Sequence, residues 1–293
     1  MGVFGTGLYS GDFAMDLRST VGAVCRLPYD GDRMVEILAD CEPIASANTK
    51  DEDYTTFWLV VADQFAKRGI VCEHVRKRAL EIIDQGHDIA RLTELGMNAP
   101  DLRKRQQVLD ELRSRLLAHT EARAQKGVLK KPQTFVMEVG DVYVYPASKG
   151  KCINPYFPSK EKIPGWQHDG WGTMIICDRG RAFDYLAWYR PITMARALSD
   201  KPGMLAIRSE EWHLRSPGTC SVVHLRRMEL TKIGSLQIDL EKLRKLGARM
   251  PSGVYQAIND ISIANQLYVH KDHGIQAGRG PAKISDLGQI LTS

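Results

Sequence analysis

Gly140-Asp141-Val142-Tyr143-Val144-Tyr145-Pro146 opens the stretch, residues 140–190, that decides the fold of this chain. Branched and aromatic side chains followed by a proline are typical of a β-strand that starts a small barrel or a curled sheet. Two further strand-like runs follow, Thr173 to Cys177 and Phe183 to Trp188, with Asp178-Arg179-Gly180 as the expected tight turn between them. We therefore predict a β-rich region, to which residues 205–212 and 220–225 add strands.

The residues before this stretch follow a helical period instead. In the strongest predicted helix, apolar residues recur at i, i+3, i+4, i+7, i+8 and i+11, namely at Tyr54, Phe57, Trp58, Val61, Ala62 and Phe65. A later helix carries Leu102, Leu109, Leu112 and Leu116 at heptad spacing. The glycines around Leu8 and Tyr9 predict an ordered N-terminal hook tucked against the first helix.

Residues 124–133 have no apolar period and are rich in Lys and Gln, which favours a linker. The sequence thus predicts an α+β protein in which a helical N-terminal domain is followed by a β-rich barrel or curled-sheet domain with a C-terminal helix. The expected boundaries are residues 1–123 for the helical domain and 134–293 for the β-rich domain. The C-terminal helix is expected over residues 254–267, before a glycine-rich tail.

Composition places the chain among soluble globular proteins, with 43% hydrophobic and 26% charged residues. Residues 1–59 carry a net charge of −6 (4 Lys and Arg against 10 Asp and Glu), residues 60–131 carry +5 and residues 132–293 carry +6. A basic remainder can steer a polyanion, although a solvated charged surface is the commoner cause of such a pattern.

The six cysteines are scattered without C-x-x-C spacing, which favours buried thiols in a reducing compartment. No apolar run approaches the roughly 18 residues of a membrane span. Residues 1–18 lack a basic segment followed by an apolar one, so they do not resemble a secretory signal. We therefore expect a cytoplasmic protein that does not enter a membrane.

Between the first two strand-like runs lies Trp166-Gln167-His168-Asp169-Gly170-Trp171, a loop richer in rings and polar side chains than a connector requires. A histidine oriented by a carboxylate can act as a general base, and two tryptophans can hold a planar ligand. The catalytic candidates are His168, Asp169 and Asp184. The predicted binding residues are Trp166, His168, Asp169, Trp171, Trp188 and Arg190.

Two features of this loop oppose catalysis. No serine or cysteine stands in a nucleophile setting such as G-x-S-x-G. Neighbouring residues of an extended segment point in opposite directions, so His168 and Asp169 need not touch. The plain structural alternative is a polar loop that packed tryptophans pin to the barrel.

Elsewhere, the segment His270-Lys271-Asp272-His273 has no identifiable distant ligand, so we expect neither a metal site nor a cofactor.

The helix after Pro100 offers a second candidate surface, because it is rich in cations. These are Arg103, Lys104, Arg105, Arg113 and Arg115. Such a helix over residues 103–123 is one way to bind nucleic acid, and its affinity would fall steeply with salt. However, Asp110 and Glu111 interrupt the cations and no aromatic residue is interleaved for base stacking. A solvated, salt-bridged helix face is the competing interpretation.

Two parts of the chain resemble known families. The opening, Met1-Gly2-x-Phe4-Gly5-Thr6-Gly7-x-Tyr9-x-x-Asp12-x-Ala14-x-Asp16, together with Asp53-x-x-x-Phe57-Trp58-Leu59-x-x-Ala62-Asp63 and Ala79-Leu80-x-Ile82-Ile83-Asp84-x-Gly86, resembles an uncharacterised bacterial helical domain family that usually starts MGxWGxGxFxxDxAxD. That resemblance covers about residues 1–120. The strand start Val139-Gly140-Asp141-Val142 resembles the immunity-protein-26-like domain, whose members are often linked to polymorphic toxin systems.

This sequence departs from these patterns in two places. Phe4 stands where the helical family usually has tryptophan, and residues 149–164 look like an insertion. These resemblances identify no catalytic residues in this chain. They imply a bacterial protein that binds a protein partner, such as a toxin or a phage-defence component, and masks or regulates it. A hydrolase acting on a nucleotide or nucleic acid through His168 with Asp169 or Asp184, and a nucleic-acid binder, stay open as alternatives.

Overall fold

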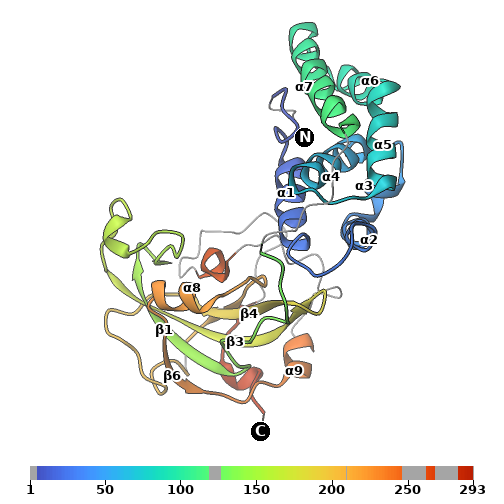
Figure 1. The fold of residues 1–293 in the computed structure, drawn as a ribbon. Coiled ribbons are helices and arrows are strands. Elements are labelled where there is room, and N and C mark those ends of the chain that lie inside the picture. The colour runs from blue at the N-terminus through green and yellow to red at the C-terminus, as the bar shows by residue number, and fades with distance from the viewer. Residues whose placement is uncertain (1–4, 119–126, 209, 246–261, 268–282, 293) are drawn as a thin grey trace. The chain divides into compact units, whose positions relative to one another are not determined.

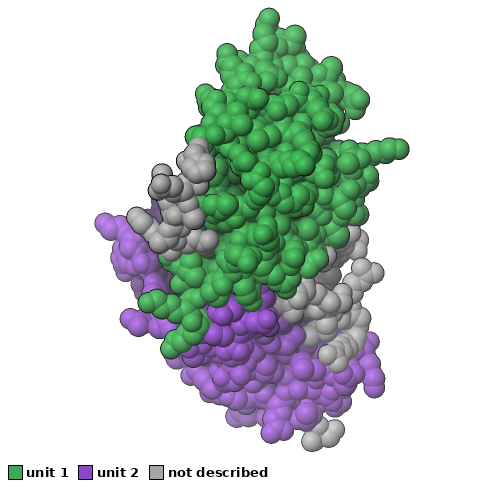
Figure 2. Space-filling view, turned by 45° about the vertical axis from the view of Figure 1, so that its right-hand side comes forward, with its two compact units in different colours: residues 1–131 green, residues 132–293 purple. Residues whose placement is uncertain are grey.

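The computed structural model of the protein describes residues 5–118, 127–208, 210–245, 262–267 and 283–292. The chain divides into two compact units, residues 1–131 and residues 132–293 (Figure 1, Figure 2). We call them the helical unit and the sheet unit. The helical unit holds α1 to α7, and the sheet unit is a curled antiparallel half-barrel with short helices, so the predicted α+β class is confirmed.

Seven α-helices follow one another in the described part of the helical unit. They are α1 (Asp12–Val24), α2 (Gly31–Cys41), α3 (Pro43–Ala47), α4 (Tyr54–Arg68), α5 (Glu73–Asp84), α6 (His87–Glu94) and α7 (Ala99–Leu117). Their starts follow ordinary capping chemistry: the Asp30 carboxylate accepts the Arg33 N–H, and the Asn98 side chain accepts the Asp101 N–H.

The core of the helical unit surrounds α4. All six residues of its predicted apolar face are buried, and the interior of the helix is covered on every side. Leu109, Leu112 and Leu116 of α7 are also buried, as their heptad spacing predicts. Burial of this periodic apolar surface is the main force that holds the helices together.

The N-terminal hook is ordered in its described part, from Gly5 onward, and it touches three helices. The Tyr9 hydroxyl hydrogen-bonds to Asp63 of α4, and the guanidinium of Arg18 on α1 lies 4.8 Å from the Tyr9 ring centroid. The Gly7 carbonyl accepts a 2.9 Å hydrogen bond from Arg105 on α7. The hook is therefore part of the packed helical unit.

In the described part of the sheet unit, seven strands form one antiparallel sheet. They are β1 (Asp141–Ser148), β2 (Lys151–Cys152), β3 (Gly170–Ala182), β4 (Leu186–Met194), β5 (Trp212–Leu214), β6 (Thr231–Ser235) and β7 (Lys283–Ile284). Their order is β2-β1-β3-β4-β5-β7, and β6 pairs with the first half of β1 while β2 pairs with its end. The short helices are α8 (Val222–Arg227) and α9 (Leu240–Lys245), with 3₁₀ turns at Lys160–Lys162, Ile263–Gln266 and Leu287–Gln289.

The sheet is covered on both faces. Tyr143 and Tyr145 of β1 belong to one apolar cluster with Tyr189, whereas Val142 belongs to a second cluster with Trp212. Successive side chains of a strand point to opposite faces, so β1 contributes to both clusters and is buried along its whole length. The sheet is thus a rigid platform for the loops at its ends.

Several local predictions are wrong. The β3–β4 turn lies at Phe183 and Asp184, both with positive φ, because β3 continues through Asp178-Arg179-Gly180 past a register shift near Cys177. Residues 205–208 form a turn, and only Trp212–Leu214 is a strand. Residues 220–225 were predicted as a strand, but Val222–Arg227 form α8. Most of the predicted C-terminal helix falls outside the described residues; Ile263–Gln266 is a short 3₁₀ helix.

Candidate functional site

The loop before β3 is fixed to the hairpin turn between β1 and β2. The Asp169 N–H donates to the Ala147 carbonyl at 3.0 Å, and its carboxylate accepts the Lys149 N–H at 2.7 Å. The Gln167 N–H donates to the Ser148 hydroxyl at 3.2 Å. Lys149 has φ of 49° in this turn, and the Asp169 carboxylate satisfies its backbone donor.

Two rings of this loop, those of His168 and Trp171, are in contact with each other. His168 is exposed and meets the Trp171 ring edge to face, with 5.0 Å between centroids and 84° between planes. Trp171 is half-buried and exchanges two backbone hydrogen bonds with Leu198, at 2.7 and 2.9 Å. The Lys201 ammonium lies 5.2 Å from the Trp171 ring centroid. We call Trp166, His168, Trp171 and Lys201 the loop surface.

Leu198 and Lys201 are site neighbours that the sequence did not reveal. They lie about thirty positions after Trp171 in the chain and reach it through an isolated β-bridge rather than through a named strand. An isolated bridge of this kind produces no periodic pattern of apolar residues in the sequence. Only the spatial structure shows that a cation covers Trp171, an arrangement that adds a cation–π attraction to the packing.

The predicted general-base pair is not assembled. The Asp169 carboxylate is turned to Lys149, and within the described residues no carboxylate hydrogen-bonds to the His168 ring. Asp184 lies in the β3–β4 turn, thirteen positions after Trp171, so roughly 40 Å of extended strand separates it from the loop at ~3.3 Å per residue. Within the described ranges, His168 therefore lacks the hydrogen-bonded carboxylate that would orient it as a general base.

Trp188 and Arg190 do not join the loop surface, which corrects the composite site expected from the sequence. Register places Trp188 opposite Gly180 and Arg190 opposite Asp178, toward the far end of β3. Both side chains are buried. The Arg190 guanidinium donates to the Arg215 carbonyl at 3.0 Å, and burial lowers its pKa below the usual value. Both side chains therefore pack inside the sheet unit, away from the exposed loop at His168.

The cations of α7 are mostly occupied by carboxylates of the helical unit. Their ion pairs are Lys104 to Asp101 at 3.1 Å, Arg105 to Asp88 at 2.7 Å, Arg113 to Asp84 at 2.7 Å and Arg115 to Asp63 at 2.7 Å. The Arg115 contact is a charge contact without the alignment of a hydrogen bond. Of the five cations, Arg103 alone makes no ion pair within the described residues. This pattern favours a salt-bridged helix face.

The cysteines and metal-ligand residues give no second centre in the described part of the chain. All six cysteines are buried and none of them forms a disulfide, and burial raises the pKa of Cys152, Cys177 and Cys220 to about 12. A thiol is nucleophilic as its thiolate, which these environments disfavour. No group of three or more His, Cys, Asp or Glu side chains that could hold a metal occurs among the described residues. The segment His270–His273 lies outside them.

No helix in the described ranges has the length and apolar character needed to cross a lipid bilayer. The comparisons with known proteins give no similarity to build on: neither a protein-family model nor a curated protein nor a solved structure matches this chain.

Proposed function

We propose that this chain is a protein-binding protein that masks or regulates a partner through the loop surface and the adjacent strands. The observation that carries the proposal is the pairing of exposed His168 with half-buried Trp171, on a loop held at three points by the end of β1 and the turn that follows it. Tryptophans are enriched among the residues that dominate binding energy at protein interfaces. A loop that is already ordered loses little entropy when it binds.

The chemistry of the loop surface suits the binding of a protein partner better than the conversion of a substrate. Its rings provide apolar area with a ring nitrogen on His168, and Lys201 adds a positive charge at the edge. An acidic or amide-rich rim on the partner would complement that charge. The resemblance to immunity-protein-26-like domains supplies the biological setting, namely toxin immunity or phage defence in a bacterium.

The test is affinity capture from native bacterial lysate with the full chain, followed by affinity measurement with the captured protein. Trp171→Ala removes the larger ring of the pair and should weaken binding by at least tenfold, about 1.4 kcal/mol. His168→Ala should weaken binding less, because the imidazole is smaller.

Tyr156→Ala is the matched control. Tyr156 is 56% exposed and forms a similar edge-to-face pair with His224, at 5.2 Å and 75°, elsewhere in the sheet unit. It should leave the affinity unchanged. Unchanged binding of every specific partner by Trp166→Ala and Trp171→Ala would refute the proposed interface. Binding that is lost steeply with salt, together with recovered nucleic acid, would instead support the α7 alternative.

A further inference from the structure

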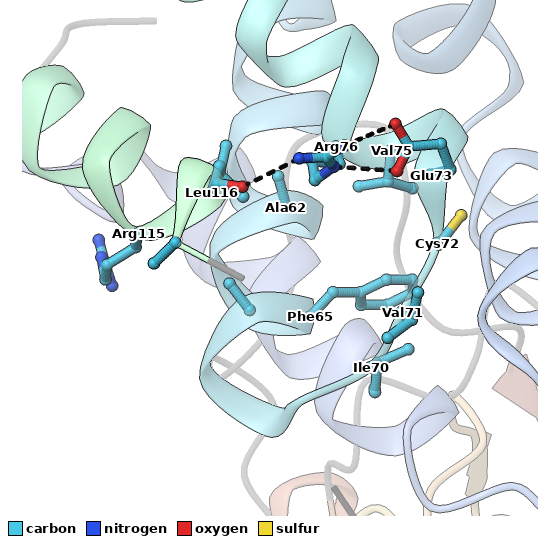
Figure 3. A pocket seen from close by; sticks show the side chains of 12 residues that line it. Ala62, Phe65, Ile70, Val71, Cys72, Glu73, Val75, Arg76, Arg115 and Leu116 are labelled. Carbon is cyan, nitrogen blue, oxygen red and sulfur yellow. Dashed lines mark hydrogen bonds and ion pairs between the residues drawn. The ribbon is translucent and has the colours of Figure 1, made fainter. Parts of the chain in front are cut away.

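The helical unit contains a cavity of about 170 Å³ that the loop surface does not involve (Figure 3). It lies between the second half of α4, the connection through Ile70, Val71 and Cys72, the first turn of α5 and the end of α7. Phe65 and Val75, both almost fully buried, form its apolar interior.

Small side chains on α4 create this space. Ala62 and Ala66 are four residues apart and therefore lie on one face of the helix, toward the cavity. Gly69 ends α4 with φ of 68°, and the chain then turns away before α5 begins. Larger residues at positions 62 and 66 would fill the gap, so its existence follows directly from the sequence.

The entrance of the cavity has an apolar side and a charged side. Val71 is 56% exposed, which leaves branched hydrocarbon in water next to an apolar hollow. Covering such surface is favourable by roughly 25 cal/mol per Å². A molecule seated in the cavity beside Val71 would remove the exposed hydrocarbon of Val71 from water.

The charged side is Arg76. Its guanidinium donates to Glu73 at 2.8 and 2.9 Å and to the Leu116 carbonyl at 3.5 Å, across the cavity lining (Figure 3). The side chains of Arg76 and Glu73 are 45% and 70% exposed, and ion pairs at such positions contribute little. An anionic ligand can therefore take the place of Glu73. Arg115 points away from the cavity and contacts buried Asp63.

We propose that this cavity binds a small apolar molecule that carries one carboxylate. The hydrocarbon part lies between Phe65 and Val75, and the carboxylate accepts hydrogen bonds from Arg76. The volume sets the size class, since a cavity of ~150 Å³ lined by apolar side chains is large enough for benzene. The proposal concerns the helical unit alone and does not rest on the function proposed for the loop surface.

Benzoate and benzyl alcohol are the probes, titrated into the full chain and followed by two-dimensional NMR. They share the ring and differ in charge, so the ratio of their affinities isolates the contribution of Arg76. Benzoate should bind about tenfold more tightly, the size expected for a hydrogen bond to a charged group. The shifted amides should be those of the cavity lining. Absence of saturable shifts at millimolar benzoate would overturn the proposal.

Two variants separate the two parts of the site. Arg76→Gln should bring benzoate down to the affinity of benzyl alcohol, whereas Ala66→Leu, which fills the cavity from a helix position, should abolish binding of both. Arg78→Gln is the matched control: it removes another surface arginine of α5, paired with Glu81 at 3.3 Å, and should change neither affinity. A preference for benzoate that survives Arg76→Gln, or equal binding by Ala66→Leu, would contradict the assignment.

Discussion

Arg105 of α7 and Asp88 of α6 form a two-point ion pair inside the helical unit, with Nε to Oδ2 at 2.7 Å and Nη2 to Oδ1 at 3.2 Å. Both side chains are shielded from solvent. The Thr55 hydroxyl donates to the same carboxylate at 3.0 Å, and Arg105 also reaches the Gly7 carbonyl at 2.9 Å. One buried charge pair therefore joins α4, α6, α7 and the N-terminal hook.

Arg105→Ala should destabilise the helical unit by about 3–5 kcal/mol, because it leaves the Asp88 carboxylate buried without its counter-charge. Urea unfolding followed by far-UV circular dichroism measures this, since the long helices belong to the helical unit. Arg103→Ala, on the exposed side of the same helix, should stay within ~0.5 kcal/mol. The double variant Arg105→Met with Asp88→Leu should recover much of the loss; no recovery would mean that shape, rather than charge, sets the cost.

Gly172→Ala should destabilise the sheet unit by about 1–3 kcal/mol, the usual cost of overpacking. A Cβ at position 172 would lie 2.3 Å from ring carbons of Tyr145, which is directly opposite on β1 and fully buried. Tryptophan fluorescence during urea unfolding reports mainly on this unit, because four of the five tryptophans belong to it. Gly203→Ala is the control, since nothing lies within 4 Å of its added Cβ. Equal stability of the two variants would contradict this packing.

Asp141→Asn should weaken the β1–β6 pairing in a pH-dependent way. Burial alone would raise the Asp141 pKa, but the Lys232 ammonium at 2.5 Å, the Glu138 N–H at 3.0 Å and the Ser235 hydroxyl at 3.1 Å outweigh it and hold the pKa below its usual value. A carboxylate with a depressed folded pKa stabilises the fold above its unfolded value of about 3.9, and the contribution is lost as pH falls through the folded value.

The stability difference between wild type and Asp141→Asn should therefore be full at pH 7 and shrink below about pH 4. Urea midpoints at pH 7, 5 and 3 measure it. Asp200→Asn, an exposed carboxylate in the same unit, should show a difference within ~0.5 kcal/mol at each pH. A difference for Asp141→Asn that does not change with pH would rule out the charge as its cause.

Periodicity allowed the helical unit to be predicted because its apolar residues recur at helical spacing. Phe57, Val61 and Phe65 recur at helical spacing and are all buried. The residues 222–225 show the opposite case. Their branched side chains favour a strand, yet the Ser221 hydroxyl caps the N–H of His224 and starts α8, which leaves Val222 and Val223 half exposed. A local capping bond outweighs strand propensity where no neighbouring strand buries the branched side chains.

The prediction that Trp188 and Arg190 join the loop surface was wrong because the pairing register of two strands cannot be read from the sequence of either strand alone. Trp188 and Trp171 belong to strands that pair with each other, but whether they meet depends on register. β3 continues past the register shift between Ile176 and Asp178 to Ala182, so the turn lies beyond position 180 and Trp188 pairs with Gly180. The rings of residues 166–171 can be read from the sequence itself, whereas the contact of Leu198 with Trp171 comes from an isolated bridge.

Asp169 links the fixed conformation of the loop to partner binding, because its carboxylate accepts the Lys149 N–H. Asp169→Ala removes the acceptor of the Lys149 N–H and should cost about 1 kcal/mol locally, the net value of one hydrogen bond. The Lys149 amide should then exchange with solvent faster, and partner affinity should fall because the loop must be ordered on binding.

Asp169→Asn separates this positioning role from a role of the charge. Its side-chain oxygen can still accept the Lys149 N–H, so amide exchange and affinity should stay close to wild type. Hydrogen exchange measured by NMR on both variants decides the matter. If Asp169→Asn loses affinity as fully as Asp169→Ala while the Lys149 amide stays protected, the carboxylate itself contacts the partner and the positioning role does not explain the loss.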